Sequence, residues 1–118
     1  MGTTIYKVLT REQWDAAQRG APVQAPVDER DGYVHFSTQA TLQGTLDKWF
    51  QGAAGAVLLS FDSDDFGDSL KWEPARGGEL FPHVYARVDA ARAQDVRQLE
   101  MDSNGRLLAS PSLSPPKV

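Results

Sequence analysis

The stretch Ala56-Val-Leu-Leu-Ser-Phe61 is the most apolar part of the chain. A run of this length is typical of a strand that is buried on both of its faces. The segment that follows it, Asp62 to Ser69, is acidic and turn-forming, with room for one helical turn. These residues therefore predict the central strand of a sheet, and the other elements are placed around it.

Two elements precede this strand at the N-terminus. Thr3 to Leu9 is rich in residues that favour a strand. Thr10-Arg-Glu-Gln13 matches a capping box, in which the threonine and glutamine side chains satisfy free backbone N–H groups at the start of a helix. The helix is expected to reach about Arg19, where Gly20 can end it.

The middle of the chain predicts a loop, a strand and a second helix. Ala21 to Gly32 contains two prolines and a charged, turn-rich run, which favour a loop. Tyr33 to Phe36 is expected to be a strand, and Ser37 and Thr38 stand where a helix N-cap belongs. The helix that follows has a stripe of apolar residues at helical spacing, which we expect to be buried, and Gly52 ends it. The stripe consists of Leu42, Leu46, Trp49 and Phe50.

The C-terminal half predicts short strands separated by turns. The expected elements are an extended piece at Leu70 to Glu73, a turn at Arg76-Gly-Gly78, a strand at Val84 to Val88, a helical turn at Asp89 to Ala93, a strand at Val96 to Met101, and a hairpin turn at Ser103-Asn-Gly105 leading into Arg106 to Ala109. This irregular order of helices and strands favours an α+β fold. We expect one domain over residues 1–109 and a disordered Ser/Pro-rich tail over residues 110–118.

Composition limits the classes of function. A chain of 118 residues fits a single domain, and its net charge of -4 argues against nucleic acid as a partner. Cysteine is absent, so disulfides and thiolate chemistry play no part in the fold. No apolar run approaches the length of a membrane helix, and the first residues lack the layout of a signal peptide. We therefore expect a cytoplasmic protein, most simply a monomer, that binds a small molecule.

The first candidate site segment is Asp31-Gly-Tyr-Val-His-Phe-Ser-Thr38. Strand alternation places Tyr33, His35 and Ser37 on one face, opposite Val34 and Phe36. His35 also precedes a helix N-terminus, where free N–H groups favour an anion. Ser37 and Thr38 are therefore candidate ligand-binding residues with His35. The alternative is a surface strand followed by an ordinary N-cap.

The second candidate segment is Leu70-Lys-Trp-Glu-Pro-Ala-Arg-Gly-Gly-Glu-Leu-Phe-Pro-His-Val-Tyr85. Trp72 beside Glu73 could place the carboxylate against an apolar wall, and desolvation would then raise its pKa. His83 and Tyr85 share a strand face. The alternative is a long loop in which Trp72 and Phe81 fill the core and the charged side chains are solvated.

Several other kinds of site are not favoured. His35, His83 and a glutamate are valid zinc ligands, but no local metal motif supports them, so we predict no metal. Ser37 lacks the glycines of a nucleophile elbow. No glycine-rich phosphate loop follows a strand.

The two candidate segments, together with Ile5-Tyr-Lys-Val-Leu-Thr10 and Trp14, resemble a family of small bacterial proteins, domain of unknown function nine hundred and fifty-two. The resemblance runs from Thr3 to about Val96. This family is similar, at a greater distance, to the ADP-ribosyltransferase fold. That similarity implies a twisted, split, mostly antiparallel β core with two main helices and a cleft for NAD.

The same similarity implies roles for individual residues. His35 would bind a ribose hydroxyl, and Tyr85 or Trp72 would stack on the nicotinamide. Glu73 would stabilise the sugar cation, and Arg76 would meet the pyrophosphate. The usual glutamate on a late strand is not evident, since Glu73 precedes a proline. A non-catalytic module that binds a small metabolite, and a small hydrolase with His35 or His83 as general base, remain alternatives.

Overall fold

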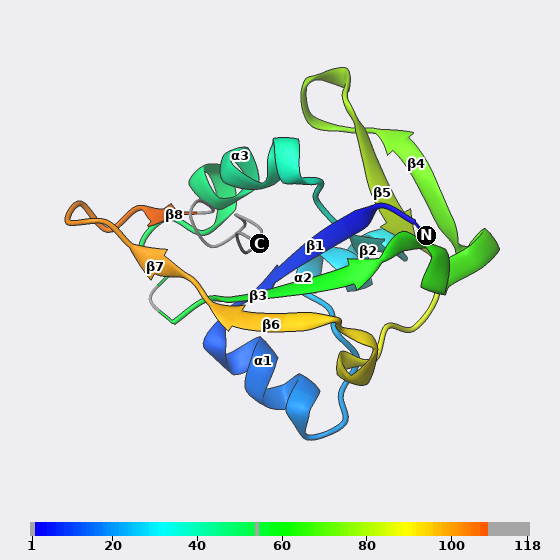
Figure 1. Cartoon of the computed structure of the whole chain (residues 1–118), viewed down its shortest axis with the longest axis horizontal. Helices are drawn as coiled ribbons and strands as arrows, with labels where there is room; N and C mark the ends of the chain where they lie inside the picture. The colour runs from blue at the N-terminus through cyan, green and yellow to red at the C-terminus, as the bar shows by residue number, and fades with distance from the viewer. Residues whose placement is uncertain (1, 54, 109–118) are drawn as a thin grey trace, which may run out of the picture.

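The computed structural model describes residues 2–53 and 55–108 of the chain. Its first sheet contains strands β1 (Thr4–Leu9), β3 (Val57–Asp62) and β6 (Asp95–Gln98) in the order β1-β3-β6, all antiparallel (Figure 1). β3 lies in the middle, so the predicted central strand is confirmed. Leu58, Leu59 and Phe61 of this strand are fully buried, as its apolar sequence predicts.

A second antiparallel sheet carries both candidate segments. Its strands are β2 (Val34–His35), β5 (Leu80–Val84) and β4 (Leu70–Pro74), in the order β2-β5-β4. An isolated bridge joins the two sheets, because Tyr6 and Ser37 exchange two backbone hydrogen bonds of 2.8 Å. A hairpin of β7 (Glu100–Met101) and β8 (Leu107–Leu108) follows β6. The β core is therefore split and antiparallel, as the resemblance implies.

Three α-helices and three short 3-10 segments complete the described chain. The α-helices are α1 (Arg11–Gln18), α2 (Pro26–Asp31) and α3 (Gln39–Trp49), and the 3-10 segments are η1 (Ser63–Ser69), η2 (Arg76–Gly78) and η3 (Ala90–Arg92). The predicted capping box of α1 is present, with Thr10 Oγ1 accepting from Gln13 N and Gln13 Oε1 accepting from Thr10 N. Among the residues described, no helix has both the length and the apolar character to cross a membrane.

The core is divided by the first sheet. On one face, Tyr6, Val8 and Leu58 pack against α3 through Leu42 and Leu46. On the other face, the first sheet packs against the second sheet and α1; the buried members of this cluster are Ile5, Leu9, Ala17, Val23, Val34, Phe36, Val57, Leu59, Phe61, Phe66, Val84 and Val88. Because strand residues alternate between faces, Lys7 projects to this second side, between Ile5 and Leu9.

The segment expected to be a loop contains α2, so that prediction was wrong. Pro26 occupies the first turn, where a missing N–H costs nothing, and Asp28 Oδ2 accepts from Ala25 N at 2.7 Å. Gly32 ends the helix with a φ of 83°, a left-handed conformation that glycine adopts without strain. The prolines that argued against regular structure thus include one that starts a helix.

Strand boundaries in the C-terminal half also differ from the expectation. β5 ends at Val84 rather than beginning there, since residues 85–88 leave the sheet. The strand expected over Val96–Met101 is interrupted at Leu99, which is buried in the core below α3. Trp49, expected in the buried stripe, is 67% exposed because α3 ends at this residue. The tail predicted to be disordered lies outside the described residues.

We predict that Leu59→Ala destabilises the protein by about 2–5 kcal/mol, because Leu59 on the central strand is fully buried and its truncation leaves a cavity. Urea unfolding would measure the loss. Its matched control is Val96→Ala. Val96 is the cross-strand partner of Leu59 on the edge strand β6 and is 40% exposed, so its loss is expected to stay below about 1 kcal/mol. Equal effects would contradict the assignment of β3 as the central strand.

Candidate functional site

The buried carboxylate of Asp28 holds together the elements that form the site. Asp28 on α2 has a side chain only 1% exposed, and both of its oxygens are occupied. Oδ2 accepts from Lys7 Nζ at 2.7 Å and from Ala25 N at 2.7 Å. Oδ1 accepts from the backbone N of His35 at 3.0 Å and lies 2.6 Å from its Nδ1. One side chain therefore connects β1, α2 and β2.

The two buried charges depend on each other. Lys7 is buried as well, and it also donates to the carbonyl oxygen of His35 at 2.9 Å. Burial lowers the pKa of Lys7, while the charge of Asp28 raises it in part. Burial also raises the pKa of Asp28, but the hydrogen bonds from His35 and Lys7 and the charge of Lys7 outweigh this, and the pKa is lowered to about 2. Asp28 is thus ionised at neutral pH.

Four aromatic rings, carried by β2, β5 and the residues next to these strands, contact one another beside this ion pair. The ring centroid of Tyr33 lies 4.6 Å from that of His35, 4.4 Å from that of His83 and 4.9 Å from that of Tyr85. The two imidazoles lie 5.2 Å apart in an edge-on arrangement. This contact follows from strand register, since His35 pairs directly with His83 across β2 and β5. The segments that hold the two histidines, distant in sequence, therefore meet at one point of the sheet.

Glu73 joins this group from the neighbouring strand β4. Its Oε1 lies 2.7 Å from His83 Nδ1 and accepts a hydrogen bond of 2.8 Å from the Tyr85 hydroxyl. These hydrogen bonds, from His83 first and Tyr85 second, lower the pKa of Glu73. The same carboxylate raises the pKa of Tyr85 to about 12. His35, Glu73 and His83, the three residues singled out from the sequence, are therefore brought together.

The ionised carboxylates define which imidazole nitrogens carry hydrogen. Asp28 and Glu73 can only accept, so Nδ1 of His35 and Nδ1 of His83 must each donate. In a neutral imidazole the remaining nitrogen, Nε2, is then an acceptor. Nε2 of His35 lies 3.1 Å from Asp31 Oδ2, a carboxylate that also accepts from Arg30. Because a carboxylate only accepts, this contact is a hydrogen bond in the imidazolium form of His35, in which both ring nitrogens carry hydrogen. The site thus contains two histidine–carboxylate pairs.

A cleft opens beside the histidines. It has a volume of about 480 Å³ and is lined by residues of β1, α2, β2 and β5 and by the end of α3. His35, His83 and Ser37 form part of its wall. A cleft of this size fits a small organic ligand.

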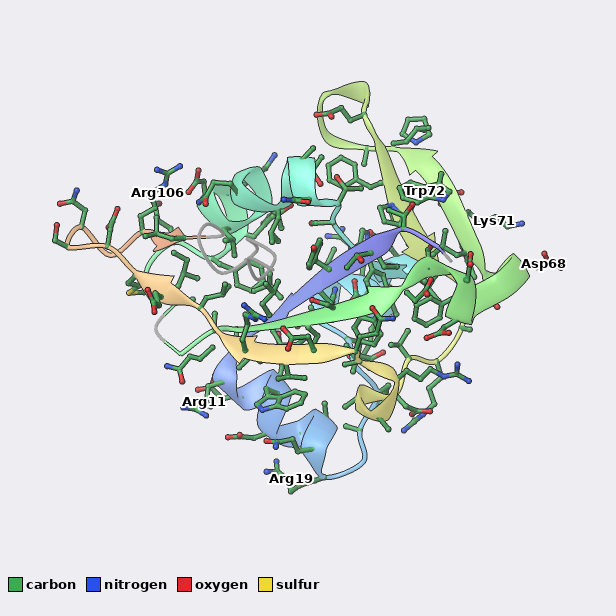
Figure 2. The ribbon with its side chains drawn as sticks, in the orientation of Figure 1. Arg11, Arg19, Asp68, Lys71, Trp72 and Arg106 are labelled. Atoms are coloured by element: carbon green, nitrogen blue, oxygen red, sulfur yellow. The ribbon has the colours of Figure 1, made fainter. Side chains whose placement is uncertain are left out.

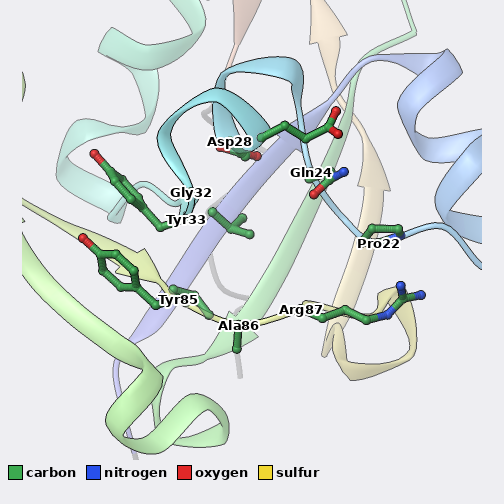
Figure 3. Close-up of a pocket in the computed structure, with 11 residues that line it drawn as sticks. Pro22, Gln24, Asp28, Gly32, Tyr33, Tyr85, Ala86 and Arg87 are labelled. Carbon is green, nitrogen blue, oxygen red and sulfur yellow. The ribbon is translucent and has the colours of Figure 1, made fainter.

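A second hollow of about 380 Å³ lies on the other side of the tyrosines. Figure 3 shows Tyr33 and Tyr85 side by side at one end of it, with Gln24 and Arg87 toward the other end. Arg87 already donates to Asp89 at 2.8 Å and to the Gly20 carbonyl at 2.6 Å. Because its guanidinium has these partners and neither histidine lines the wall, the first cleft is the better candidate site.

Ser37 and Thr38 have different positions. The Ser37 hydroxyl is buried at the cleft wall, 2.9 Å from the hydroxyl of Thr45. Thr38 is the N-cap of α3, and its hydroxyl accepts from Thr41 N at 3.3 Å. The expected N-cap is therefore confirmed for Thr38, while Ser37 is the one that faces the cleft.

The expected effect of Trp72 on the pKa of Glu73 was wrong. Strand alternation places Trp72 on the face of β4 opposite Glu73 and Lys71, it pairs with Pro82, and it is 41% exposed (Figure 2). It therefore cannot desolvate Glu73, and the pKa of Glu73 is lowered rather than raised. The side chain of Arg76 lies outside the described residues.

Sequence reasoning overlooked Lys7, Asp28 and Tyr33 as a connected group. The signal for Lys7 was present, because it occupies an inward position of β1 between Ile5 and Leu9, where a charge requires a partner. Asp28 stands three residues after Ala25 at a helix start that begins with proline. No sequence feature identified it as the partner of Lys7. Within the described part of the chain, no group of three histidine or acidic side chains is arranged to hold a metal ion.

We predict that Lys7→Met destabilises the protein by about 3–5 kcal/mol, because it leaves the charge of Asp28 buried without its partner. Chemical denaturation would measure this loss. Asp89→Asn is the control, since it breaks an exposed ion pair with Arg87, for which we expect less than about 1 kcal/mol. A loss of similar size in both variants would contradict the structural role of the Lys7–Asp28 pair.

We also predict a pH dependence of stability that arises from Asp28. Its folded-state pKa of about 2 lies below the ordinary value of 3.8, so its contribution is present above pH 3.8 and is lost as the pH falls toward 2. An NMR titration of the Asp28 carboxyl carbon would give a midpoint near 2, accompanied by falling urea midpoints over this range. A midpoint near 4 would contradict the bonding described.

Comparison with known proteins agrees with this fold. A family model described as "Protein of unknown function (DUF952)" matches residues 8–96. The crystal structure of protein CC0527 from Caulobacter crescentus is 38% identical, with a TM-score of 0.85 over 90% of this chain and 94% of that chain. The solution NMR structure of CC0527 is 37% identical, with a TM-score of 0.82 over 94% of this chain and 97% of that one. No curated protein matches the chain. The chain belongs to the DUF952 family.

Proposed function

We propose that the cleft binds a nucleotide of the NAD or ADP-ribose class beside His83, and that Glu73, which contacts His83 from outside the cleft lining, stabilises positive charge on the ribose when nicotinamide leaves. The observation that supports this most strongly is the state of Glu73. Its carboxylate accepts from both His83 and Tyr85, and its pKa is lowered. A sugar cation is stabilised by a carboxylate that is already ionised and fixed in place, whereas a general acid needs a raised pKa.

The histidines fit the binding part of this proposal. Nδ1 of each ring faces a carboxylate, which orients the ring. Nε2 of His83 is then left for a ribose hydroxyl, whereas Nε2 of His35 lies 3.1 Å from Asp31 Oδ2, so a ribose hydroxyl would bind it in place of that carboxylate. Tyr33 supplies an aromatic face next to both rings. The distant similarity to the ADP-ribosyltransferase fold implies the same roles for His35 and Glu73, and it assigns stacking to Tyr85 or Trp72; Tyr33 contacts Tyr85.

A second candidate is a small hydrolase with a histidine general base. The His83–Glu73 pair favours it, because a carboxylate on Nδ1 holds the imidazole in the form whose Nε2 accepts a proton. The two candidates differ in product. The first releases nicotinamide from NAD, and the second cleaves an ester or phosphodiester without touching the glycosidic bond.

For the first candidate we predict that ADP-ribose binds the wild-type protein and that NAD is converted to nicotinamide and ADP-ribose or a transferred ADP-ribosyl group. Glu73→Gln keeps the size of the side chain and removes its charge. We expect it to retain ADP-ribose binding and to lower nicotinamide release by about 100-fold or more. Calorimetry would measure binding, and chromatography would measure nicotinamide.

Glu79→Gln serves as the control, because Glu79 is exposed at the turn between β4 and β5 and is expected to leave both readouts unchanged. If ADP-ribose binds but no nicotinamide is released, the catalytic part of the proposal fails and a binding module remains. If neither NAD nor ADP-ribose raises the melting temperature at millimolar concentration, the nucleotide proposal fails entirely.

A further inference from the structure

The wall of the cleft combines two kinds of side chain. The imidazoles of His35 and His83 and the Ser37 hydroxyl are polar. Val27, Trp49 and Phe50, from α2 and the end of α3, are apolar. A ligand that fills the cleft must therefore combine a polar part with a flat or apolar part.

Trp49 differs from the other apolar residues of its helix face in being largely exposed. It lies at the position of α3 that follows Leu42 and Leu46 on the same helix face, yet those two leucines are buried and Trp49 is 67% exposed. The helix ends at Trp49, so its indole stands at the rim of the cleft instead of in the core. An indole offers a large rigid face for stacking on another ring.

Basic groups accompany this indole. The ammonium group of Lys48 lies 5.2 Å from the centre of the Trp49 ring. Arg30 lines the same cleft, bonded through its guanidinium to Asp31. The Asp31 carboxylate offsets the charge of Arg30, so a ring that stacks on Trp49 would place an adjoining phosphate in the field of one cation, Lys48, although the chain as a whole has a net charge of -4.

We propose that the part of the cleft wall formed by Trp49 is a base-binding subsite, in which the purine ring of a nucleotide stacks on Trp49 and its phosphate faces Lys48. This inference rests on the proposed function, and it assigns the adenine to Trp49 and the ribose that reacts to the histidines. Trp49 then determines selectivity for ligands that carry a base over sugar phosphates that lack one.

The test compares ADP-ribose with ribose 5-phosphate on three proteins. Trp49→Ala is expected to weaken ADP-ribose binding by about 10-fold or more, because stacking of a base on an aromatic ring contributes about 1–3 kcal/mol. Binding of ribose 5-phosphate is expected to be unchanged. Trp72→Ala is the matched control, since Trp72 is also exposed but lies outside the cleft lining, and it is expected to bind both ligands as the wild type does.

Tryptophan fluorescence supplies a second readout. ADP-ribose is expected to change the emission of the wild type and of Trp72→Phe but not that of Trp49→Phe. Equal affinity of Trp49→Ala and wild type for ADP-ribose would overturn the subsite and leave the proposed function intact. Absence of ADP-ribose binding to the wild type would overturn both.

Size-exclusion chromatography with light scattering would test whether a second copy of the chain, rather than a nucleotide, covers Trp49. We expect the wild type and Trp49→Ala to have the same mass in solution. A wild-type dimer that Trp49→Ala converts to a monomer would overturn the subsite, because Trp49 would then contact a second copy of the chain.

Discussion

The ion pair between Lys7 and Asp28 is the interaction on which the rest of the site depends. It is buried between the first sheet and α2, where an unpaired charge of either sign would be costly. Through the same carboxylate it fixes the backbone and the ring of His35. This single ion pair thus determines how β1, α2 and β2 pack together. Its carboxylate also determines that Nδ1 of His35 carries hydrogen.

The pairing register of the second sheet places the remaining residues of the site. β5 lies between β2 and β4, so His83 is next to His35 on one side and within reach of Glu73 on the other. Tyr33 packs against both imidazole rings. A shift of one residue in the strand pairing would turn every side chain to the opposite face, so the register fixes which side chains meet. Polar groups whose positions are fixed in this way form a preorganised site.

The two histidine–carboxylate pairs are not equivalent. Asp28 is buried and bonded on both oxygens, so it acts on His35 and cannot itself reach a ligand. Glu73 is 38% exposed and stands at the edge of the sheet, where it holds His83 and still faces solvent. This difference supports a structural and orienting role for Asp28, whereas Glu73 remains accessible from solvent.

Local sequence determined much of the fold and the members of the site. The apolar run before Phe61 identified the central strand, the Thr10 capping box identified the start of α1, and strand alternation placed Tyr33 and His35 on one face. These features depend on neighbours within a few residues, which is why they could be predicted. The family membership was recognisable from the same motifs.

Only the tertiary structure decided which distant charges meet. Nothing near Lys7 in the sequence indicates that Asp28 is its partner, because the contact exists only after α2 packs against β1. Likewise, Trp72 follows Lys71 and precedes Glu73 in the chain but faces away from both, so adjacency in sequence predicted a contact that the strand geometry forbids. Trp49 has helical spacing typical of the core and is nevertheless exposed, because the end of α3 lies at the rim of the cleft. Sequence periodicity defines the faces of an element, and only packing defines what each face meets.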